Sequence, residues 1–340
     1  MIQFSPAALR RSVLLSLLIL CGLVLPAAAQ VTIFSPFNVP GAVDENIRKQ
    51  PDVAYADGER GRLDIYAPKE QSGLAPVVMF IYGGAWRAGA RFEYEFVGRA
   101  FAANGFVAVV PDYRVGSDVR YPAFLEDNAQ AMKWIEDNIA TYGGDKQRFF
   151  LAGHSAGAYN AVMLALDSSF RREFGVTMPI RAVAGISGPY NFYPFEYNEV
   201  RETFGEAPNP EGTQPVNLVT PETPPMLLAS GTTDPIVRVE NSKALARSLR
   251  AQGVWVTEKY YEGFGHLEPV IAMGQLWRWR MPVLADILGF FGTFGAFPSG
   301  APQLAYTPEP PAGTPDKMQS VIAEMENILE PIDNGSAVLP

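Results

Sequence analysis

Short runs of apolar residues recur along the chain, separated by segments with apolar residues at helical spacing. The continuous apolar runs predict buried strands at 76–82, 105–110, 149–152, 181–186, 226–230 and 254–260. Residues 62–66 alternate between apolar and polar side chains, which predicts an edge strand. Helical spacing predicts helices at 92–103, 122–142, 155–166 and 241–252. This alternation predicts an α/β fold, with a mainly parallel central sheet and helices on both faces.

Three later segments depart from the alternation. Residues 190–224 are rich in proline and aromatic side chains and lack a strand pattern, so we expect a short cap-like insertion there. Residues 297–315 have the proline, glycine and alanine content of a linker. Residues 316–340 begin with an amphipathic helix, for which Asp316 is a plausible N-cap, and end in a tail. Its apolar face can pack on its own domain, which we favour, or on a partner.

The N-terminal residues have the pattern of a signal peptide. Arg10 and Arg11 precede an apolar run over 13–25, and small residues follow up to Ala29. We therefore expect residues 1–29 to be cleaved after Ala29 and the protein to be exported, either to a periplasm or by secretion. An uncleaved anchor is the alternative, although the run is short for a membrane span. The only cysteine, Cys21, follows bulky residues, which argues against lipidation at that site.

The composition of the chain bears on the size of its core and on the kinds of partner it can bind. The chain has 340 residues, of which 48% are hydrophobic, so the predicted domain over 30–296 has enough apolar residues for one large core. The formal net charge of −9 argues against a nucleic-acid partner, because binding to phosphates requires a basic surface. No pattern of a zinc finger, a Walker loop or an EF-hand is present in the sequence, and we expect no metal.

The stretch Gly153-His154-Ser155-Ala156-Gly157 lies between a predicted strand and a predicted helix. A G-x-S-x-G sequence in that context is typical of a nucleophile elbow, a tight turn that exposes the serine hydroxyl above the sheet. The amide groups at the start of the helix favour negative charge at the same place. We therefore predict that Ser155 is a catalytic nucleophile.

A serine nucleophile needs a base and an orienting acid. The sequence has two histidines, and the His154 side chain should point away from the Ser155 hydroxyl, which leaves His266 as the base. Asp234 follows the strand predicted at 226–230, at the sheet edge where α/β proteins place their ligands. The competing interpretations are a surface histidine and a turn-forming Asp-Pro pair, and Glu268 is the alternative acid.

Small residues follow the apolar run that ends at Tyr82. Gly83-Gly84-Ala85 leaves backbone N–H groups accessible to a developing oxyanion, and the amide after the nucleophile, that of Ala156, would be the second donor. A simple turn at the end of the strand would explain the glycines but not Trp86 beside them.

Together these stretches, and Pro111-Asp112-Tyr113-Arg114 with them, resemble the esterase/lipase branch of the α/β-hydrolase superfamily over roughly residues 52–291. The resemblance implies the α/β-hydrolase fold, a triad and an oxyanion hole, substrate contacts from the insertion, and no organic cofactor. The residues implied are Ser155, Asp234 and His266 for the triad, Gly84, Ala85 and Ala156 for the oxyanion hole, and Trp86, Tyr190 and Phe192 for substrate binding. The chain departs from the family at Tyr82, where the family has a histidine that braces the loop.

The sequence therefore predicts a serine hydrolase that cleaves small-molecule carboxylic esters through an acyl-enzyme. An amide hydrolase of the kynurenine-formamidase type uses the same tetrahedral intermediate and is the close alternative. A non-catalytic binding protein on this fold is another. A third alternative is a lipase acting at a membrane surface, because Trp277, Arg278, Trp279 and Arg280 lie together within 273–291. We favour the interpretation of 273–291 as the last helix of the fold.

Overall fold

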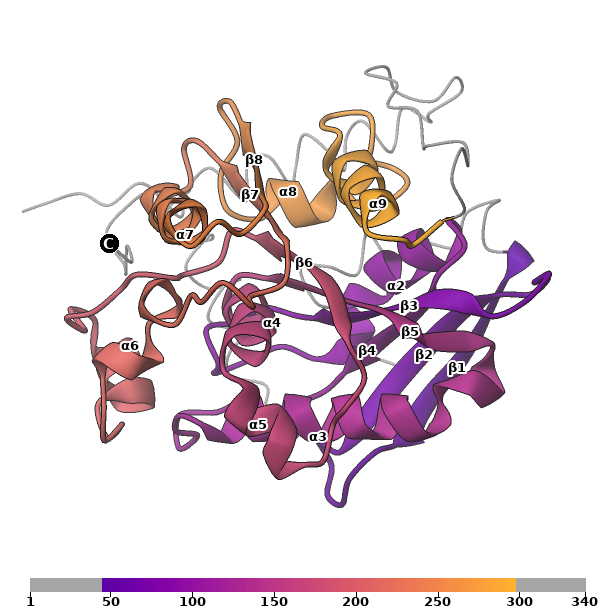
Figure 1. The fold of residues 1–340 in the computed structure, drawn as a ribbon, viewed down its shortest axis with the longest axis horizontal. Coiled ribbons are helices and arrows are strands. Elements are labelled where there is room, and N and C mark those ends of the chain that lie inside the picture. Colours follow the sequence, from indigo (N-terminus) through magenta and orange to yellow (C-terminus); the bar gives the residue numbers. More distant parts are fainter. Residues whose placement is uncertain (1–44, 298–340) are drawn as a thin grey trace, which may run out of the picture. The chain divides into compact units, whose positions relative to one another are not determined.

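The computed structural model describes residues 45–297, which form one eight-stranded sheet with helices on both faces (Figure 1). The strand order is β1-β2-β4-β3-β5-β6-β7-β8. The pairs β1–β2 and β2–β4 are antiparallel and all other neighbours are parallel. The strands are β1 Ile47–Ala54, β2 Arg62–Pro68, β3 Ala75–Ile81, β4 Val107–Pro111, β5 Gly144–His154, β6 Ile180–Ile186, β7 Met226–Gly231 and β8 Val256–Tyr261.

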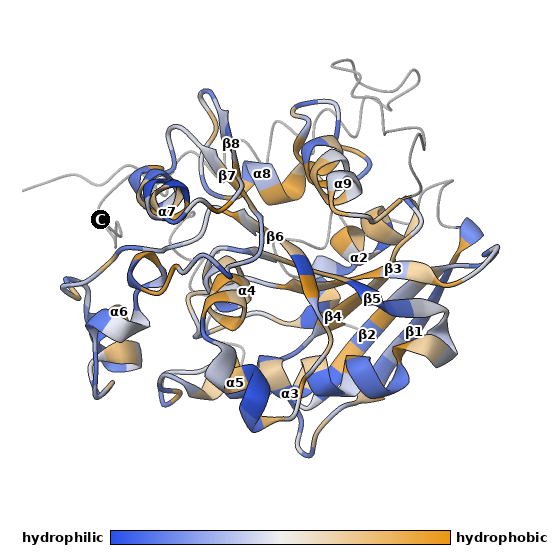
Figure 2. Ribbon diagram, in the orientation of Figure 1, coloured by the Kyte–Doolittle hydropathy of each residue, from blue (hydrophilic) through white to orange (hydrophobic). Residues whose placement is uncertain are grey.

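Helices α3, α4 and α7 lie on one side of the sheet, and α2 and α9 lie on the other (Figure 1). The central strands β3 and β4 are buried along their whole length, whereas hydrophilic residues cover much of α5 and α7 (Figure 2). The helices are α2 Glu95–Ala102, α3 Ala123–Asn138, α4 Ala156–Leu166, α5 Ser168–Glu173, α6 Asn198–Phe204, α7 Glu240–Ala251, α8 Glu268–Ile271 and α9 Val283–Thr293. This arrangement confirms the predicted α/β-hydrolase fold.

The prediction of an edge strand at 62–66 is wrong in one respect. A strand is present there, β2, but it lies between β1 and β4 in the sheet. Its alternation was misleading because the polar residue Asp64 is buried too, where it accepts a hydrogen bond from Arg91 at 2.8 Å. The edge strands are β1 and β8. The sequence did not predict β1, because its residues are mostly exposed and polar. The strand predicted at 254–260 is present as β8, but the prediction that it is buried is wrong, because at the sheet edge most of its residues are only half-buried.

The predicted last helix over 273–291 is also wrong in its start. The helix α9 begins only at Val283, and Trp277 to Arg280 lie in turns before it. Pro282 explains the break, because a residue before proline is disfavoured in the helical conformation. Trp277 is buried, and the Arg280 guanidinium lies over its ring. Among residues 45–297, no helix has the length and apolar composition needed to cross a membrane.

The insertion predicted over 190–224 contains the helix α6 and two short 3₁₀ turns, Glu211–Thr213 and Pro215–Asn217. It contains no strand, as expected from its composition. The predicted signal peptide, the linker from residue 298 on and the C-terminal helix lie outside the described residues.

Candidate active site

The stretch around Ser155 forms a tight turn between β5 and α4. Ser155 has φ 54° and ψ −123°, a strained conformation for a residue with a side chain. A Cβ atom on Gly153 would lie 2.3 Å from the Gly157 carbonyl oxygen, and one on Gly157 would lie 2.1 Å from the Ile81 carbonyl oxygen. Both glycines are therefore required by close backbone contacts, and the turn leaves the Ser155 side chain partly exposed.

Three side chains predicted from the sequence form a continuous hydrogen-bonded series. His266 Nε2 lies 2.9 Å from Ser155 Oγ, and His266 Nδ1 lies 2.8 Å from Asp234 Oδ2. The carboxylate only accepts, so Nδ1 donates, and Nε2 of a neutral ring is then the acceptor for the serine hydroxyl. The imidazole is in the correct tautomer to take the Ser155 proton.

Asp234 and His266 are held by two loops that are bonded to each other. Asp234 follows β7, and its Oδ1 accepts hydrogen bonds from the amides of Ile236 and Val237 at 2.9 and 2.8 Å. His266 follows β8. The Thr233 amide donates to the Phe264 carbonyl at 3.0 Å, which ties the two loops together. The Asp234 side chain is fully buried and His266 is 7% exposed, so water has little access to their hydrogen bond.

The residues predicted for the oxyanion hole lie at the same edge of the sheet. Ala85 and Ala156 line a pocket together with Ser155. Ala156 is the first residue of α4, so its amide has no acceptor within that helix. Gly84 has φ 131° and its carbonyl accepts from the amides of Arg87 and Ala88, so it forms the turn itself. The donor roles of Gly84, Ala85 and Ala156 stay predictions.

The pocket beside Ser155 has a volume of about 130 Å³ and mostly apolar walls. Trp86 is one wall, and its indole Nε1 donates to Asn160 Oδ1 at 3.0 Å. The insertion supplies Val200 from α6. The full set of lining residues is Ala85, Trp86, Ser155, Ala156, Pro189, Tyr197, Glu199, Val200, Ile236 and Val237. The sequence predicted four of these as site residues, namely Ala85, Trp86, Ser155 and Ala156. The apolar pair Ile236–Val237, just after the Asp234-Pro235 turn, was a signal for two others.

Tyr190 and Phe192, predicted to bind substrate, are not among the residues that line this pocket. Both are buried. Phe192 packs behind the pocket wall, with its ring centroid 6.3 Å from that of Trp86. Tyr190 lies against Gly185 and Gly188. The two side chains thus support the wall, and substrate contact by them stays a prediction.

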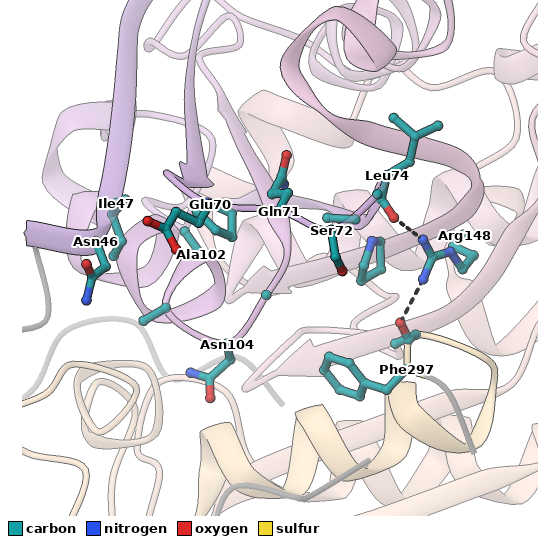
Figure 3. Close-up of a pocket in the computed structure, with 17 residues that line it drawn as sticks. Asn46, Ile47, Glu70, Gln71, Ser72, Leu74, Ala102, Asn104, Arg148 and Phe297 are labelled. Carbon is teal, nitrogen blue, oxygen red and sulfur yellow. Dashed lines mark hydrogen bonds between the residues drawn. The ribbon is translucent and has the colours of Figure 1, made fainter. Parts of the chain in front are cut away.

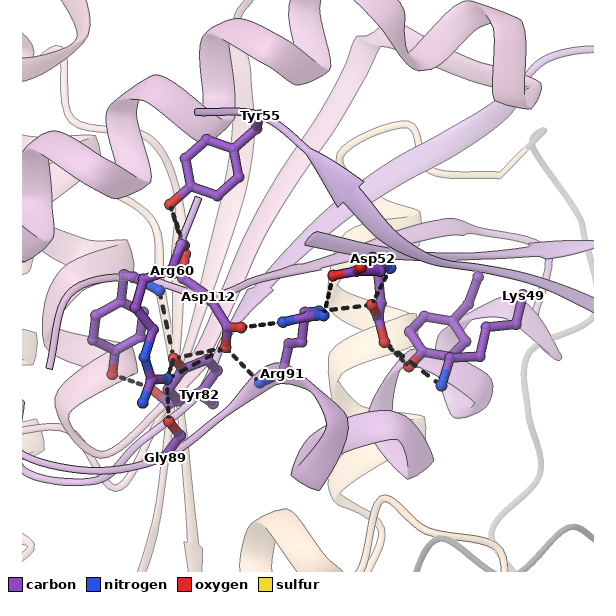
Figure 4. Close-up of polar contacts among 11 residues, drawn as sticks. Lys49, Asp52, Tyr55, Arg60, Tyr82, Gly89, Arg91 and Asp112 are labelled. Atoms are coloured by element: carbon purple, nitrogen blue, oxygen red, sulfur yellow. Dashed lines mark hydrogen bonds and ion pairs between the residues drawn. The ribbon is translucent and has the colours of Figure 1, made fainter. Parts of the chain in front are cut away.

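Tyr82 braces the loop in place of the family's histidine (Figure 4). Its hydroxyl donates to Asp112 Oδ1 at 3.0 Å, and burial raises its pKa well above the ordinary value, so the hydroxyl stays protonated. Its carbonyl accepts from the Tyr113 hydroxyl at 2.7 Å. Asp112 also pairs with Arg91, and Arg60 donates to the Gly89 carbonyl at 2.7 Å. The loop from Tyr82 to Gly89, which contains Ala85, is therefore fixed at both of its ends.

Comparison with known proteins agrees with this geometry. The sequence profile of the BD-FAE family matches residues 63–249. The isoprenylcysteine alpha-carbonyl methylesterase ICME of Arabidopsis thaliana is 29% identical over 64% of this chain and 56% of its own length. Esterase LipC of Mycobacterium tuberculosis is 31% identical over 58% of this chain and 54% of its own. The chain thus spans about half the length of the curated relatives it matches.

Among solved structures, esterase B of Lactobacillus rhamnosis, inhibited by a tributyrin phosphonate, is similar with a TM-score of 0.69. It is 20% identical, and the similarity covers 86% of this chain and 96% of that one, so the likeness concerns the fold. The sheet order, the elbow and these matches place the protein in the esterase/lipase branch of the α/β-hydrolase superfamily. Within that branch, the chain belongs to the BD-FAE family.

Among the described residues, no group of three or more His, Cys, Asp or Glu side chains is arranged to hold a metal ion.

Proposed function

We propose that the protein is a serine hydrolase that cleaves carboxylic esters. The observation that carries the proposal is the series of hydrogen bonds from Ser155 through His266 to Asp234, beside a pocket that Ala85 and Ala156 line together with Ser155. The names of the relatives, esterases and a methylesterase, support the same chemistry.

Each group has one role in the proposed reaction. Ser155 Oγ attacks the ester carbonyl carbon while His266 Nε2 takes its proton, and the carbonyl oxygen becomes an oxyanion facing the two amides. The bond to the alcohol oxygen then breaks, and His266 gives the proton to that oxygen. Water, activated by His266 in the same way, releases the acid from Ser155. Asp234 holds the ring and stabilises the imidazolium.

The pocket beside Ser155 favours a short acyl group. The departing alcohol must receive its proton from His266, so it lies on the His266 side of the serine. His266 is not among the residues that line the pocket, which leaves the pocket to the acyl arm. A volume of about 130 Å³ with walls from Trp86 and Val200 suits an acyl chain of a few carbons.

Amide hydrolysis of the kynurenine-formamidase type remains the alternative, because an amide passes through the same tetrahedral intermediate. It differs in the leaving group, which must be protonated more fully before it departs.

The test is hydrolysis of p-nitrophenyl acetate, butyrate and decanoate, and of the matching anilides, by the protein and by Ser155→Ala. We expect turnover of acetate and butyrate, much slower turnover of decanoate and of the anilides, and none by the variant. Anilides cleaved faster than esters would favour the amide hydrolase. Equal activity of Ser155→Ala, or no turnover of any substrate by folded protein, would contradict the proposal.

We further propose that the protein is exported and that its mature form begins at Gln30. The proposal rests on the pattern of charged, apolar and small residues over 1–29. Expression of the full chain in a bacterium, followed by cell fractionation and N-terminal sequencing, tests it. Protein retained in the cytoplasm with an intact N-terminus would contradict it.

A further inference from the structure

The His154 side chain lies between the two loops on which the proposed reaction depends. His154 is the last residue of β5 and is buried. Its Nε2 lies 3.1 Å from the carbonyl oxygen of His266, and the two ring centroids are 5.0 Å apart. Because a carbonyl oxygen only accepts, Nε2 carries the hydrogen and donates it. The residue before the nucleophile thus bonds to the backbone of the predicted base.

The other nitrogen of the His154 ring, Nδ1, faces Tyr94 and Gly83, the residue that follows Tyr82. His154 Nδ1 lies 3.5 Å from the Tyr94 hydroxyl, and that hydroxyl also hydrogen-bonds the backbone of Gly83. Gly83 itself is close to the elbow, since a Cβ atom there would lie 2.9 Å from Ser155 Cβ and 3.0 Å from His154 Nδ1. His154 therefore connects the loop that precedes Ala85 with the loop that carries His266.

The ring is suited to this place because it stays neutral. Burial, together with the neighbouring His266, lowers the pKa of His154 from 6.5 to about 3. With one hydrogen on Nε2 and a lone pair on Nδ1, the ring matches an acceptor on one side and a hydroxyl on the other. It adds no positive charge beside the imidazolium that His266 becomes during the reaction.

We propose that His154 is a positioning residue that holds the His266 backbone so that the imidazole stays within reach of Ser155 Oγ. The inference rests on the proposed function and goes beyond it. Asp234 fixes the His266 ring through its Nδ1. The loop that carries His266, however, contains two glycines just before it, Gly263 with φ 76° and Gly265. The bond from His154 is a buried anchor on the His266 backbone itself.

Three substitutions separate the hydrogen bond from packing. In His154→Gln the side-chain amide nitrogen stands near the position of Nε2 and can still donate to the His266 carbonyl. In His154→Asn the amide is one methylene too short, and in His154→Phe the ring remains without a donor. We expect kcat for p-nitrophenyl acetate to fall about 100-fold in the Asn and Phe variants and less than about 10-fold in the Gln variant. KM should change less than about threefold, because His154 does not line the pocket.

Circular dichroism and thermal unfolding of each variant show that the molecules compared are folded. If the Phe variant does not fold, the comparison of Gln with Asn decides. Wild-type kcat in the Asn variant, or equal losses in the Gln and Asn variants, would overturn the positioning role. If the wild type hydrolyses no ester, the proposed function fails separately. The rate at which a fluorophosphonate labels Ser155 in the same variants then tests His154, with the same order expected.

Discussion

The two edges of the parallel sheet each carry a pocket, and the pockets differ in more than size. The pocket at the amino ends of the strands, lined by Ala75, Gly105 and Arg148 among others, has a volume of about 790 Å³ (Figure 3). The pocket at the carboxyl ends, beside Ser155, has about 130 Å³. In the larger pocket the Arg148 guanidinium donates hydrogen bonds to the carbonyls of Leu74 and Ala296. This side chain therefore connects the segments before β3 and after α9.

At the carboxyl edge, by contrast, buried polar side chains are aimed at one another and at a partly exposed serine. The Asp234 carboxylate is fully buried, accepts from two amides and orients His266. Pocket volume alone would place the active site at the wrong edge of the sheet. Catalysis depends instead on polar groups that are oriented before the substrate binds.

The largest expected difference between the two edges is in kcat, when one carboxylate at each edge is replaced by its amide. Asp234→Asn removes the acceptor for His266 Nδ1–H and favours the wrong tautomer, so kcat should fall about 10⁴-fold. Glu70→Gln, in the amino-edge pocket, should change kcat less than about twofold. Ester hydrolysis by the two purified variants is the measurement, and similar losses in both would contradict the contrast.

A second difference concerns stability. Tyr82→Phe removes a hydrogen bond to the buried Asp112 carboxylate, so the free energy of unfolding should fall by about 2 kcal/mol. Tyr142→Phe, near the amino edge, should change it by less than about 0.5 kcal/mol. Urea unfolding of both variants measures these values. An unchanged midpoint for Tyr82→Phe would show that the hydroxyl does not brace the loop.

A third prediction uses pH. The unfolded chain protonates His154 below about pH 6.5, whereas in the folded protein its pKa is lowered to about 3. The unfolded state therefore binds more protons between these values, and stability falls as the pH is lowered through this range. From about pH 7 to about pH 5, wild type should lose about 2 kcal/mol more than His154→Gln. Equal losses in urea unfolding would show that the ring is not held neutral.

The smallest expected effect concerns the acyl pocket. Val200→Ala removes two methyl groups from its wall, so the kcat/KM of p-nitrophenyl hexanoate relative to acetate should rise about tenfold. Leu74→Ala, in the amino-edge pocket, should leave this ratio unchanged. A ratio that stays constant in Val200→Ala would place the acyl arm elsewhere.

Most core strands and the candidate active-site residues could be predicted from the sequence, because both follow from local patterns of residues. Continuous apolar runs predicted β3 to β7, most of whose residues are buried, and the G-x-S-x-G stretch predicted the turn at Ser155. The edge strand β1 was missed because exposed residues leave no apolar pattern. Asp64 misled the interpretation of β2, since its burial depends on Arg91, 27 residues away.

The same limit applies to the site. Ser155, His266 and Asp234 follow strand ends, so the topology brings them together. The contact of His154 with the His266 carbonyl spans 112 residues and depends on a ring orientation that no local pattern contains. The walls from α6 likewise depend on how the insertion folds back over Trp86.

The central claim is that Ser155 is the residue that becomes acylated, and covalent labelling tests it most directly. A fluorophosphonate forms a phosphorus–oxygen bond with an activated serine hydroxyl and releases fluoride. Mass spectrometry of tryptic peptides should then find a single adduct, on Ser155 within residues 149–171, and none in Ser155→Ala. An adduct on a different residue, or none in protein that hydrolyses esters, would contradict the account.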